Sequence, residues 1–205
     1  MKWFCTSDTH FGHWNICKYC ERPFSSVGQM NKVLIDNWNS RVKDEDTVFV
    51  LGDFCFKNTP GGKNGEGEMV KAEFHLRQLK GNKICIKGNH DQTNSLHSII
   101  ESMEVKYGGH HINMVHRPEH AKIGRINLVG HVHNHWKVKK LDFDTILLNV
   151  GVDAWNFMPI TLDEAVVECN KALRDVRNRY VTGVKGEVIV NGEKINICNS
   201  TCDDE

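Results

Sequence analysis

The sequence predicts an α/β fold with parallel strands, and three observations support this prediction. Short apolar runs alternate with helical patterns over residues 1–90. The run Thr47–Leu51 is rich in β-branched and aromatic residues, as is typical of a strand covered on both faces. Several apolar runs end directly at a polar residue that can bind a metal. Strands that alternate with helices are joined by right-handed crossovers and lie parallel in one sheet.

The first half of the chain contains three expected strands, at residues 2–6, 47–51 and 83–87. A helix is expected after Ser25 or Ser26, because apolar residues from Val27 to Trp38 recur at helical spacing and either serine can cap it. The glycine-rich stretch 58–67 is expected to be a loop beside the site. A second helix is expected at 68–80, with Gly81 as its stop residue.

The second half repeats this logic with strands expected at 112–115, 125–129 and 145–150. The capping box at 161–164 predicts a long helix that continues to about Tyr180. Residues 187–197 are expected to form a hairpin around an Asn-Gly turn, and 200–205 to be disordered. We therefore expect a main domain at 1–182, followed by a C-terminal hairpin and tail at 183–205.

Composition narrows the classes of function. The chain has 205 residues, enough to bury a core without disulfides, and its eight cysteines are irregularly spaced, so we expect them to be reduced packing residues. Twenty-six basic residues balance twenty-six acidic ones, which argues against binding to duplex nucleic acid or an anionic membrane. No apolar run is long enough to span a membrane or to act as a signal peptide, so a cytoplasmic location is expected.

The residues that follow the expected strands share one chemical property, since each offers an oxygen or nitrogen ligand: Asp8, Asp53, Asn89, His116 and His131. Ligands of parallel sheets gather beyond the carboxyl ends of the strands. Together with His10 and His133 these residues supply four nitrogens and three oxygens, which suits two ions bridged by one carboxylate. Mixed nitrogen and oxygen ligation fits Mn²⁺, Fe²⁺, Zn²⁺ or Ni²⁺, of which Mn²⁺ is expected first.

At this point the sequence resembles a known family. The segments Ser7-Asp8-Thr9-His10, Gly52-Asp53, Gly88-Asn89-His90-Asp91, His116 and Gly130-His131-Val132-His133 resemble, in order and spacing, the five signature blocks of the calcineurin-like metallophosphoesterases. Residues 149–156 resemble the segment after the last block in small bacterial and phage members. The resemblance implies two packed mixed β-sheets flanked by helices, a four-layer sandwich to which the C-terminal hairpin is an addition.

The resemblance also implies a role for each residue. It assigns Asp8, His10 and His133 to the first metal ion, and Asn89, His116 and His131 to the second. Asp53 bridges the two ions, His90 is the general acid, and Asp91 orients or charges His90. The implied activity is a binuclear metal-dependent phosphohydrolase that cleaves a phosphomonoester or phosphodiester. A hydroxide shared by the ions attacks phosphorus, and His90 protonates the leaving oxygen.

Four further histidine and arginine assignments complete the expectations. His13 and Arg117 are candidates for contact with the substrate phosphate. For each of them the alternative is an ordinary surface residue. His13 has a further alternative, a position behind the metal ligands. His75 and His97 lie in expected helices and are expected at the surface.

Two other functions stay open at the sequence level. The first is a nuclease acting on DNA or RNA, which the neutral net charge disfavours. The second is a non-catalytic scaffold of the same fold, although such a scaffold would lose ligands or the acid that this chain keeps. Specificity is expected to come from loop 58–67, the stretch 14–24 and the terminal hairpin, while the sequence does not set the oligomeric state.

Overall fold

The computed structural model describes residues 1–56, 71–91, 96–181, 187–190 and 193–196, with side chains described up to residue 174. The expected loop 58–67, the Asn-Gly turn and the tail 200–205 lie outside the described residues. None of the helices in the described part of the chain is long and apolar enough to cross a membrane.

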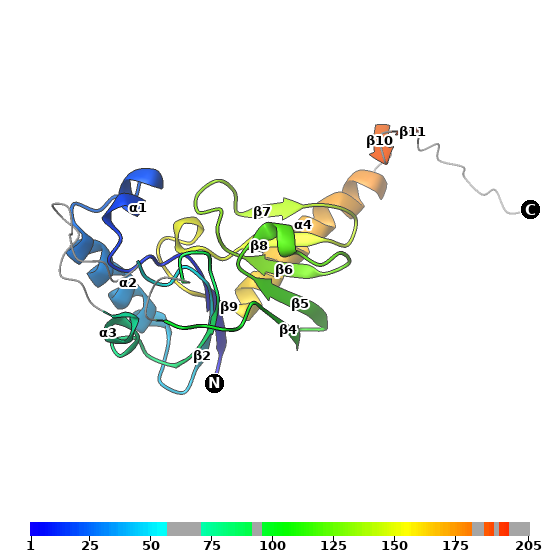
Figure 1. The fold of residues 1–205 in the computed structure, drawn as a ribbon. Coiled ribbons are helices and arrows are strands. Elements are labelled where there is room, and N and C mark those ends of the chain that lie inside the picture. The colour runs from blue at the N-terminus through cyan, green and yellow to red at the C-terminus, as the bar shows by residue number, and fades with distance from the viewer. Residues whose placement is uncertain (57–70, 92–95, 182–186, 191–192, 197–205) are drawn as a thin grey trace, which may run out of the picture.

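Two mixed sheets form the centre of the molecule, which confirms the predicted fold class (Figure 1). The first sheet contains, from edge to edge, β3 (Asn82–Ile86), β2 (Thr47–Leu51), β1 (Trp3–Thr6) and β9 (Ile160–Thr161). The second contains β4 (Ser102–Tyr107), β5 (His110–Val115), β6 (Ile126–Val129), β8 (Ile146–Asn149) and β7 (Val138–Lys140). In each sheet three neighbouring strands are parallel: β1, β2 and β3 in the first, and β5, β6 and β8 in the second.

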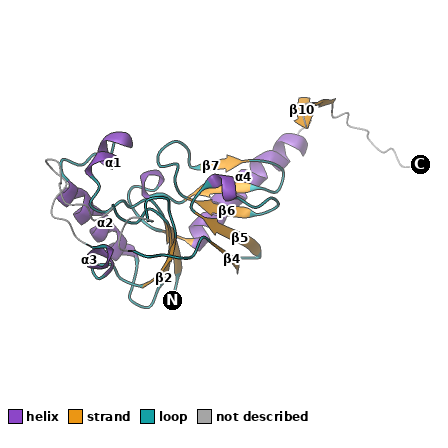
Figure 2. Cartoon of the chain, viewed as in Figure 1, coloured by secondary structure: helices purple, strands orange, loops and turns teal. Residues whose placement is uncertain are grey.

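Three helices, α1 (Trp14–Tyr19), α2 (Val27–Arg41) and α3 (Ala72–Leu76), are drawn together on one side of the first sheet (Figure 2). Buried Met30, Leu34 and Trp38 of α2 belong to the same apolar core as Phe4 and Val48 of that sheet. The helix begins where predicted, since the side chain of Ser26 accepts a hydrogen bond from the Gln29 N–H. Burial of this apolar stripe is what fixes the helices on the sheet.

The helix predicted at 68–80 is shorter than expected within the described residues. α3 ends at Leu76, and α2 side chains bond the backbone that follows it. Asn39 donates to the carbonyl of Gln78 (2.7 Å) and accepts from the Lys80 N–H (2.9 Å). These bonds hold the segment in turns instead of a continued helix. The prediction for His75 was also wrong, because its ring is buried and stacked on Phe11 with ring centroids 4.7 Å apart.

A second apolar core lies between the two sheets and explains their packing. Leu51 and Ile86 of the first sheet share this core with Ile112 and Leu128 of the second. The long helix α4 (Leu162–Val181) contacts strands of both sheets and contributes Leu162, Ala165 and Cys169. Its predicted capping box is present, with Thr161 N donating to Glu164 Oε2 (2.8 Å) and Glu164 N donating to Thr161 Oγ1 (3.1 Å).

Three smaller features complete the fold. Two 3-10 helices, η1 (Pro118–His120) and η2 (Val152–Ala154), follow β5 and β8. Strands β10 (Glu187–Val190) and β11 (Glu193–Asn196) pair antiparallel beyond α4, as the predicted hairpin requires (Figure 1). The cysteines with described side chains are buried, with the exception of the partly buried Cys85, which agrees with a packing role.

Candidate metal centre

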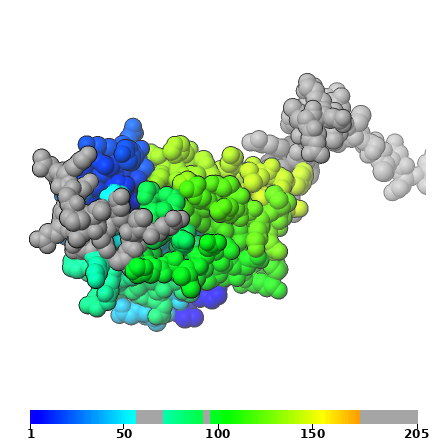
Figure 3. All heavy atoms as spheres, in the orientation of Figure 1, coloured from blue at the N-terminus to red at the C-terminus, as the bar shows by residue number. Residues whose placement is uncertain are grey.

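The predicted site residues meet where the loops after β1, β2 and β3 of the first sheet approach those after β5 and β6 of the second. Parallel pairing places the strand ends at one edge, with Thr6 beside Val50 and Leu51 beside Ile86. Chain segments from the N-terminal region and from the second half lie side by side on the face drawn in Figure 3. The distances given below place polar residues that follow separate strands at one rim.

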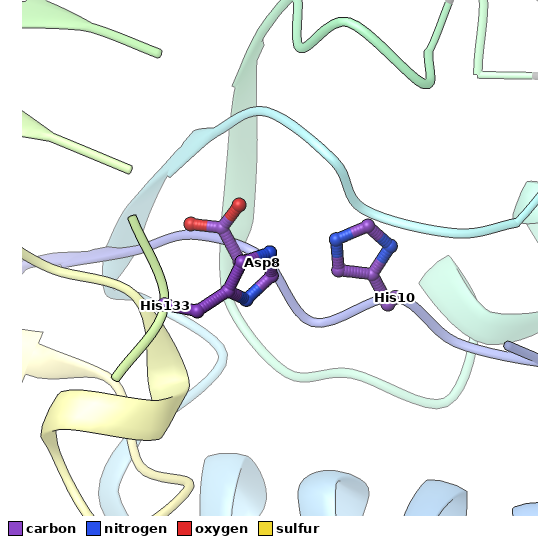
Figure 4. A group of neighbouring side chains, drawn as sticks. All are labelled: Asp8, His10 and His133. Carbon is purple, nitrogen blue, oxygen red and sulfur yellow. The ribbon is translucent and has the colours of Figure 1, made fainter. Parts of the chain in front are cut away.

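One group consists of Asp8, His10 and His133, which each offer one ligand atom within 4.8 Å of the others. Asp8 and His10 come from the loop after β1, and His133 comes from the loop after β6 (Figure 4). Both oxygens of Asp8 also accept the backbone N–H of His131, at 3.1 and 2.9 Å. These bonds join the loops of the two sheets at the site.

A second group consists of Asp53, His116 and His131, whose ligand atoms also lie within 4.8 Å of one another. Asn89 belongs with this group, because its Oδ1 lies 2.9 Å from His116 Nε2. Asp53 Oδ2 lies 3.4 Å from His116 Nε2 and 3.6 Å from His10 Nε2. One carboxylate therefore faces a histidine of each group.

The donor atoms in this pocket fit divalent ions. The ring of His116 uses Nδ1 to donate to the carbonyl oxygen of Leu51 (2.8 Å), so its neutral form presents a bare lone pair at Nε2. That nitrogen faces the oxygens of Asn89 and Asp53, so the arrangement requires either a proton on the ring or a metal ion among these atoms. Nε2 of His10 is buried and has no hydrogen-bond partner among the described residues. A buried nitrogen of this kind fits a metal ligand.

Electrostatics in the pocket favour positive charge. Burial lowers the pKa of His116, but the hydrogen bond to Asp53 and the charges of Asp8 and Asp53 outweigh it and raise that pKa to about 9. Burial raises the pKa of Asp53, yet the bond and charge of His116 and the charge of His10 hold it well below its usual range. Asp53 therefore stays ionised in its buried position, which is the form that binds cations.

The backbone at the site adopts a conformation that ordinary residues avoid. Left-handed φ angles occur at Asp8 (57°), His10 (50°), Asp53 (51°), His131 (70°) and His133 (46°). Each such residue costs of the order of 1–3 kcal/mol and persists only where its surroundings impose it. The loops supply that constraint in part through Asp8 N, which donates to Gly52 O (3.1 Å), and His10 N, which donates to Asp53 O (3.0 Å). Strain concentrated at these residues indicates a functional site.

Gly88 lets its backbone approach Asp53 closely, and this leads to a prediction. A Cβ at this position would lie 2.2 Å from Asp53 Oδ1 and 2.3 Å from Asp53 N. Gly88→Ala should therefore displace the carboxylate of Asp53 and weaken the binding of divalent ions. The measurement is the amount of Mn²⁺ bound per chain. Gly28→Ala is the control, because a Cβ there meets nothing nearer than Ser26 Oγ at 3.9 Å. Retention of both ions by Gly88→Ala would show that the two loops can separate without cost.

His90 stands at the edge of the pocket and is exposed. Its backbone N–H donates to Asp53 Oδ1 (2.8 Å), and its ring lies 5.3 Å from the ring of His10, centroid to centroid. Asp91 is buried, and its carboxylate accepts the N–H groups of Asp53 (2.8 Å), Phe54 (3.2 Å) and Gly88 (2.8 Å). Asp91 thus ties the loop after β3 to the loop after β2, a contact that the sequence did not predict.

His13 and Arg117, the two candidates for substrate contact, occupy different positions. His13 is buried, its Nδ1 lies 3.4 Å from Nδ1 of His10, and its ring stacks on Phe56. Burial lowers the pKa of His13 to about 4, so its neutral ring is suited to orienting His10 and not to attracting phosphate. Arg117 lines a cavity of about 200 Å³ together with Asn89 and His116. Arg117 thus lies beside the second group of donors, and His13 lies behind His10.

Two buried residues near the site were missed by sequence reasoning. Arg22 pairs with Asp153 at 2.7 Å, and Asp153 Oδ2 lies 2.9 Å from Nδ1 of His133. A lone arginine beside Pro23 carries no signal in the sequence, since its partner is distant along the chain. Asp153 does lie in the segment 149–156 that resembles family members.

Comparison with known proteins agrees with this geometry. The sequence model of the calcineurin-like phosphoesterases matches residues 1–186. An uncharacterized protein of Methanocaldococcus jannaschii is 35% identical over 186 residues, which cover 86% of this chain and 97% of the relative. The gene 66 protein of Mycobacterium phage L5 is 33% identical over 89 residues, or 43% of this chain and 39% of that protein.

A solved structure shares the fold. The protein of unknown function AQ665 from Aquifex aeolicus superposes with a TM-score of 0.58 at 25% identity, covering 80% of this chain and 97% of the other. Because the family match extends from residue 1 to residue 186 and includes every loop of the candidate metal centre, the chain belongs to the calcineurin-like phosphoesterase family.

Proposed function

We propose that this protein is a binuclear metal-dependent phosphohydrolase. The observation that supports this most strongly is the position of Asp53, whose Oδ2 faces Nε2 of His10 at 3.6 Å and Nε2 of His116 at 3.4 Å. A carboxylate that faces both groups of donors is what a bridged pair of ions requires. The family to which the chain belongs supports the reaction class, and the donor geometry supports the use of two ions.

In this proposal Asp8, His10 and His133 would hold the first ion, Asn89, His116 and His131 would hold the second, and Asp53 would serve both. Two divalent ions in this position would supply a water of lowered pKa and neutralise the phosphoryl oxygens. Mn²⁺ is our first candidate for these mixed donors, with iron, zinc and nickel as alternatives.

The remaining steps belong to side chains of the protein. His90 is exposed next to Asp53 and His10, so its ring can reach the leaving group of a substrate bound at the rim. Protonated His90 gives its proton to the leaving oxygen as the bond to phosphorus breaks. Asp91 keeps the His90 loop in register with Asp53 through the backbone bonds described above. Arg117 lies where its guanidinium can bind a phosphate oxygen.

A substrate panel tests this proposal. Purified protein with added Mn²⁺ should hydrolyse at least one of an aryl phosphomonoester, an aryl phosphodiester, a cyclic nucleotide, a dinucleoside polyphosphate and duplex DNA. Activity should disappear with a chelator and return with Mn²⁺. Turnover of duplex DNA above all other substrates would favour the nuclease instead. Tight binding of two ions without turnover of any compound would favour the non-catalytic scaffold.

A further inference from the structure

We propose that Arg22 and Asp153 are positioning residues for the first of the two ions. They hold the ligand set Asp8, His10 and His133 in place without contacting the ion themselves. This inference rests on the proposed function, because it concerns the same site. It adds two residues whose loss should lower the affinity for only one of the two ions.

Asp153 fixes the ring of His133. Its Oδ2 lies 2.9 Å from Nδ1 of His133, and an ionised carboxylate can only accept, so Nδ1 carries the proton and Nε2 is free to bind metal. The loop backbone has separate support, since Asn149 Nδ2 donates to the carbonyl oxygens of His133 (2.7 Å) and Trp136 (2.9 Å). Loss of Asp153 would therefore release the ring while the loop stays in place. Carboxylates in this relation to a ligand histidine set its orientation and basicity.

Arg22 connects Asp153 to the other two ligands. Its Nε and Nη2 donate to the two oxygens of Asp153 at 2.7 and 2.9 Å. The same guanidinium donates to the carbonyl oxygens of Asp8 (2.7 Å) and Thr9 (3.1 Å). Asp8 and His10, the neighbours of Thr9, both have left-handed φ angles. The side chains of this pair are 0% and 3% exposed, so water does not compete for these bonds. One buried cation thus couples the Asp8–His10 backbone to the partner of His133.

A competing interpretation is a separate metal site. Cys20, His133 and Asp153 also offer ligand atoms within 4.8 Å of one another. Arg22, however, already engages both oxygens of Asp153, and a second cation there would face a buried guanidinium. The charge arrangement therefore favours orientation of His133 over metal binding by this cluster.

The second group of ligands has different supports. Nδ1 of His116 donates to the carbonyl oxygen of Leu51, and Asp91 bonds the backbone on which Asp53 lies. The first contact joins the loop after β5 to the end of β2, and the second joins the loops after β2 and β3. Neither involves Arg22 or Asp153. Removing the Arg22–Asp153 pair should therefore lower the affinity for the first ion and leave the affinity for the second unchanged.

Binding of Mn²⁺ alone tests this inference by calorimetric titration of metal-free protein, with electron paramagnetic resonance as a second readout. Asp153→Asn leaves Arg22 as a buried cation without its partner and can unfold the chain, so the double variant Arg22→Met with Asp153→Asn is included. Because the double variant removes both charges, it leaves neither one buried without its partner. We expect one of two sites to weaken by about 10–100-fold, the usual effect of losing such a partner, while the other keeps its affinity.

The control breaks another arginine–carboxylate pair, which is more exposed and lies away from the site. Arg41 Nη2 donates to both oxygens of Glu164 at 2.7 and 2.8 Å, and Arg41→Met with Glu164→Gln should leave both ions unchanged. Equal weakening of both ions in the Arg22 and Asp153 double variant, unchanged affinities, or the same loss in the control would overturn the inference. Wild-type protein that binds no Mn²⁺ would overturn the proposed function itself, and this inference with it.

Discussion

Replacing Asp53 by asparagine should remove both ions, or nearly so, and abolish hydrolysis of every phosphate ester. Asp53 is the carboxylate that faces His10 and His116 together, so its charge is the negative charge common to both sites. Two-metal sites contribute several kcal/mol of charge stabilisation in the transition state, which corresponds to a loss of roughly 10³-fold or more in rate. Elemental analysis after dialysis, together with turnover at saturating Mn²⁺, measures the effect.

Asp46→Asn provides the control for Asp53→Asn. Asp46 is a buried carboxylate that accepts backbone N–H groups from Lys2 (2.6 Å) and Lys43 (3.0 Å), and it lies outside the metal centre. This variant should lose some stability and keep both ions. Two tightly bound ions in the Asp53→Asn variant would show that Asp53 does not bridge them.

His90→Asn should keep both ions but lose about 10²–10⁴ in rate toward an alkyl ester, which is the usual contribution of a general acid. That loss equals roughly 3–5 kcal/mol of transition-state stabilisation. An aryl leaving group such as nitrophenolate needs little protonation, so the same variant should lose much less on an aryl ester. His90 offers its backbone N–H to Asp53, and asparagine preserves that bond, so the side chain alone is tested.

Asn89→Ala is the comparison for His90→Asn, because the two residues are adjacent but have different proposed roles. Asn89 Oδ1 lies 2.9 Å from His116 Nε2, within the second group of donors. Its loss should weaken one ion and slow alkyl and aryl esters alike. Turnover of both variants on both esters, with metal content checked, separates the roles. If His90→Asn slows both esters equally, His90 stabilises charge on the phosphoryl group and does not deliver a proton.

The metal centre was predictable because its residues follow directly from a simple rule. Parallel strands end at one rim, and an apolar run that stops at Asp8, Asp53 or Asn89 identifies that rim without any long-range information. The same rule identified two candidate ligands in the second half of the chain, because His116 follows β5 and His131 follows β6. Local sequence therefore identified the candidate donors, and the family pattern supplied their proposed division between two ions.

The second sheet and the supports of the ligands were less visible. β5 and β6 are joined by a loop and a 3-10 helix, so the helical crossover that indicates parallel strands is missing there. Strand β4 lies at the edge of its sheet with alternate residues exposed, and its polar sequence gives little signal. Arg22 and Asp153 meet only after folding, across 131 residues of chain. Pairs of this kind depend on tertiary packing that no local pattern encodes.

Each group of candidate ligands combines residues from the loops of both sheets, and this has a consequence for synthesis of the protein. Asp8 and His10 leave the ribosome early, but His133 follows more than half a chain later, and Asp153 later still. A nascent chain that has completed only β1, β2 and β3 can offer an ion some of the proposed donors, with weak affinity and no fixed geometry. Complete groups of donors therefore form only after the second half of the chain has been translated.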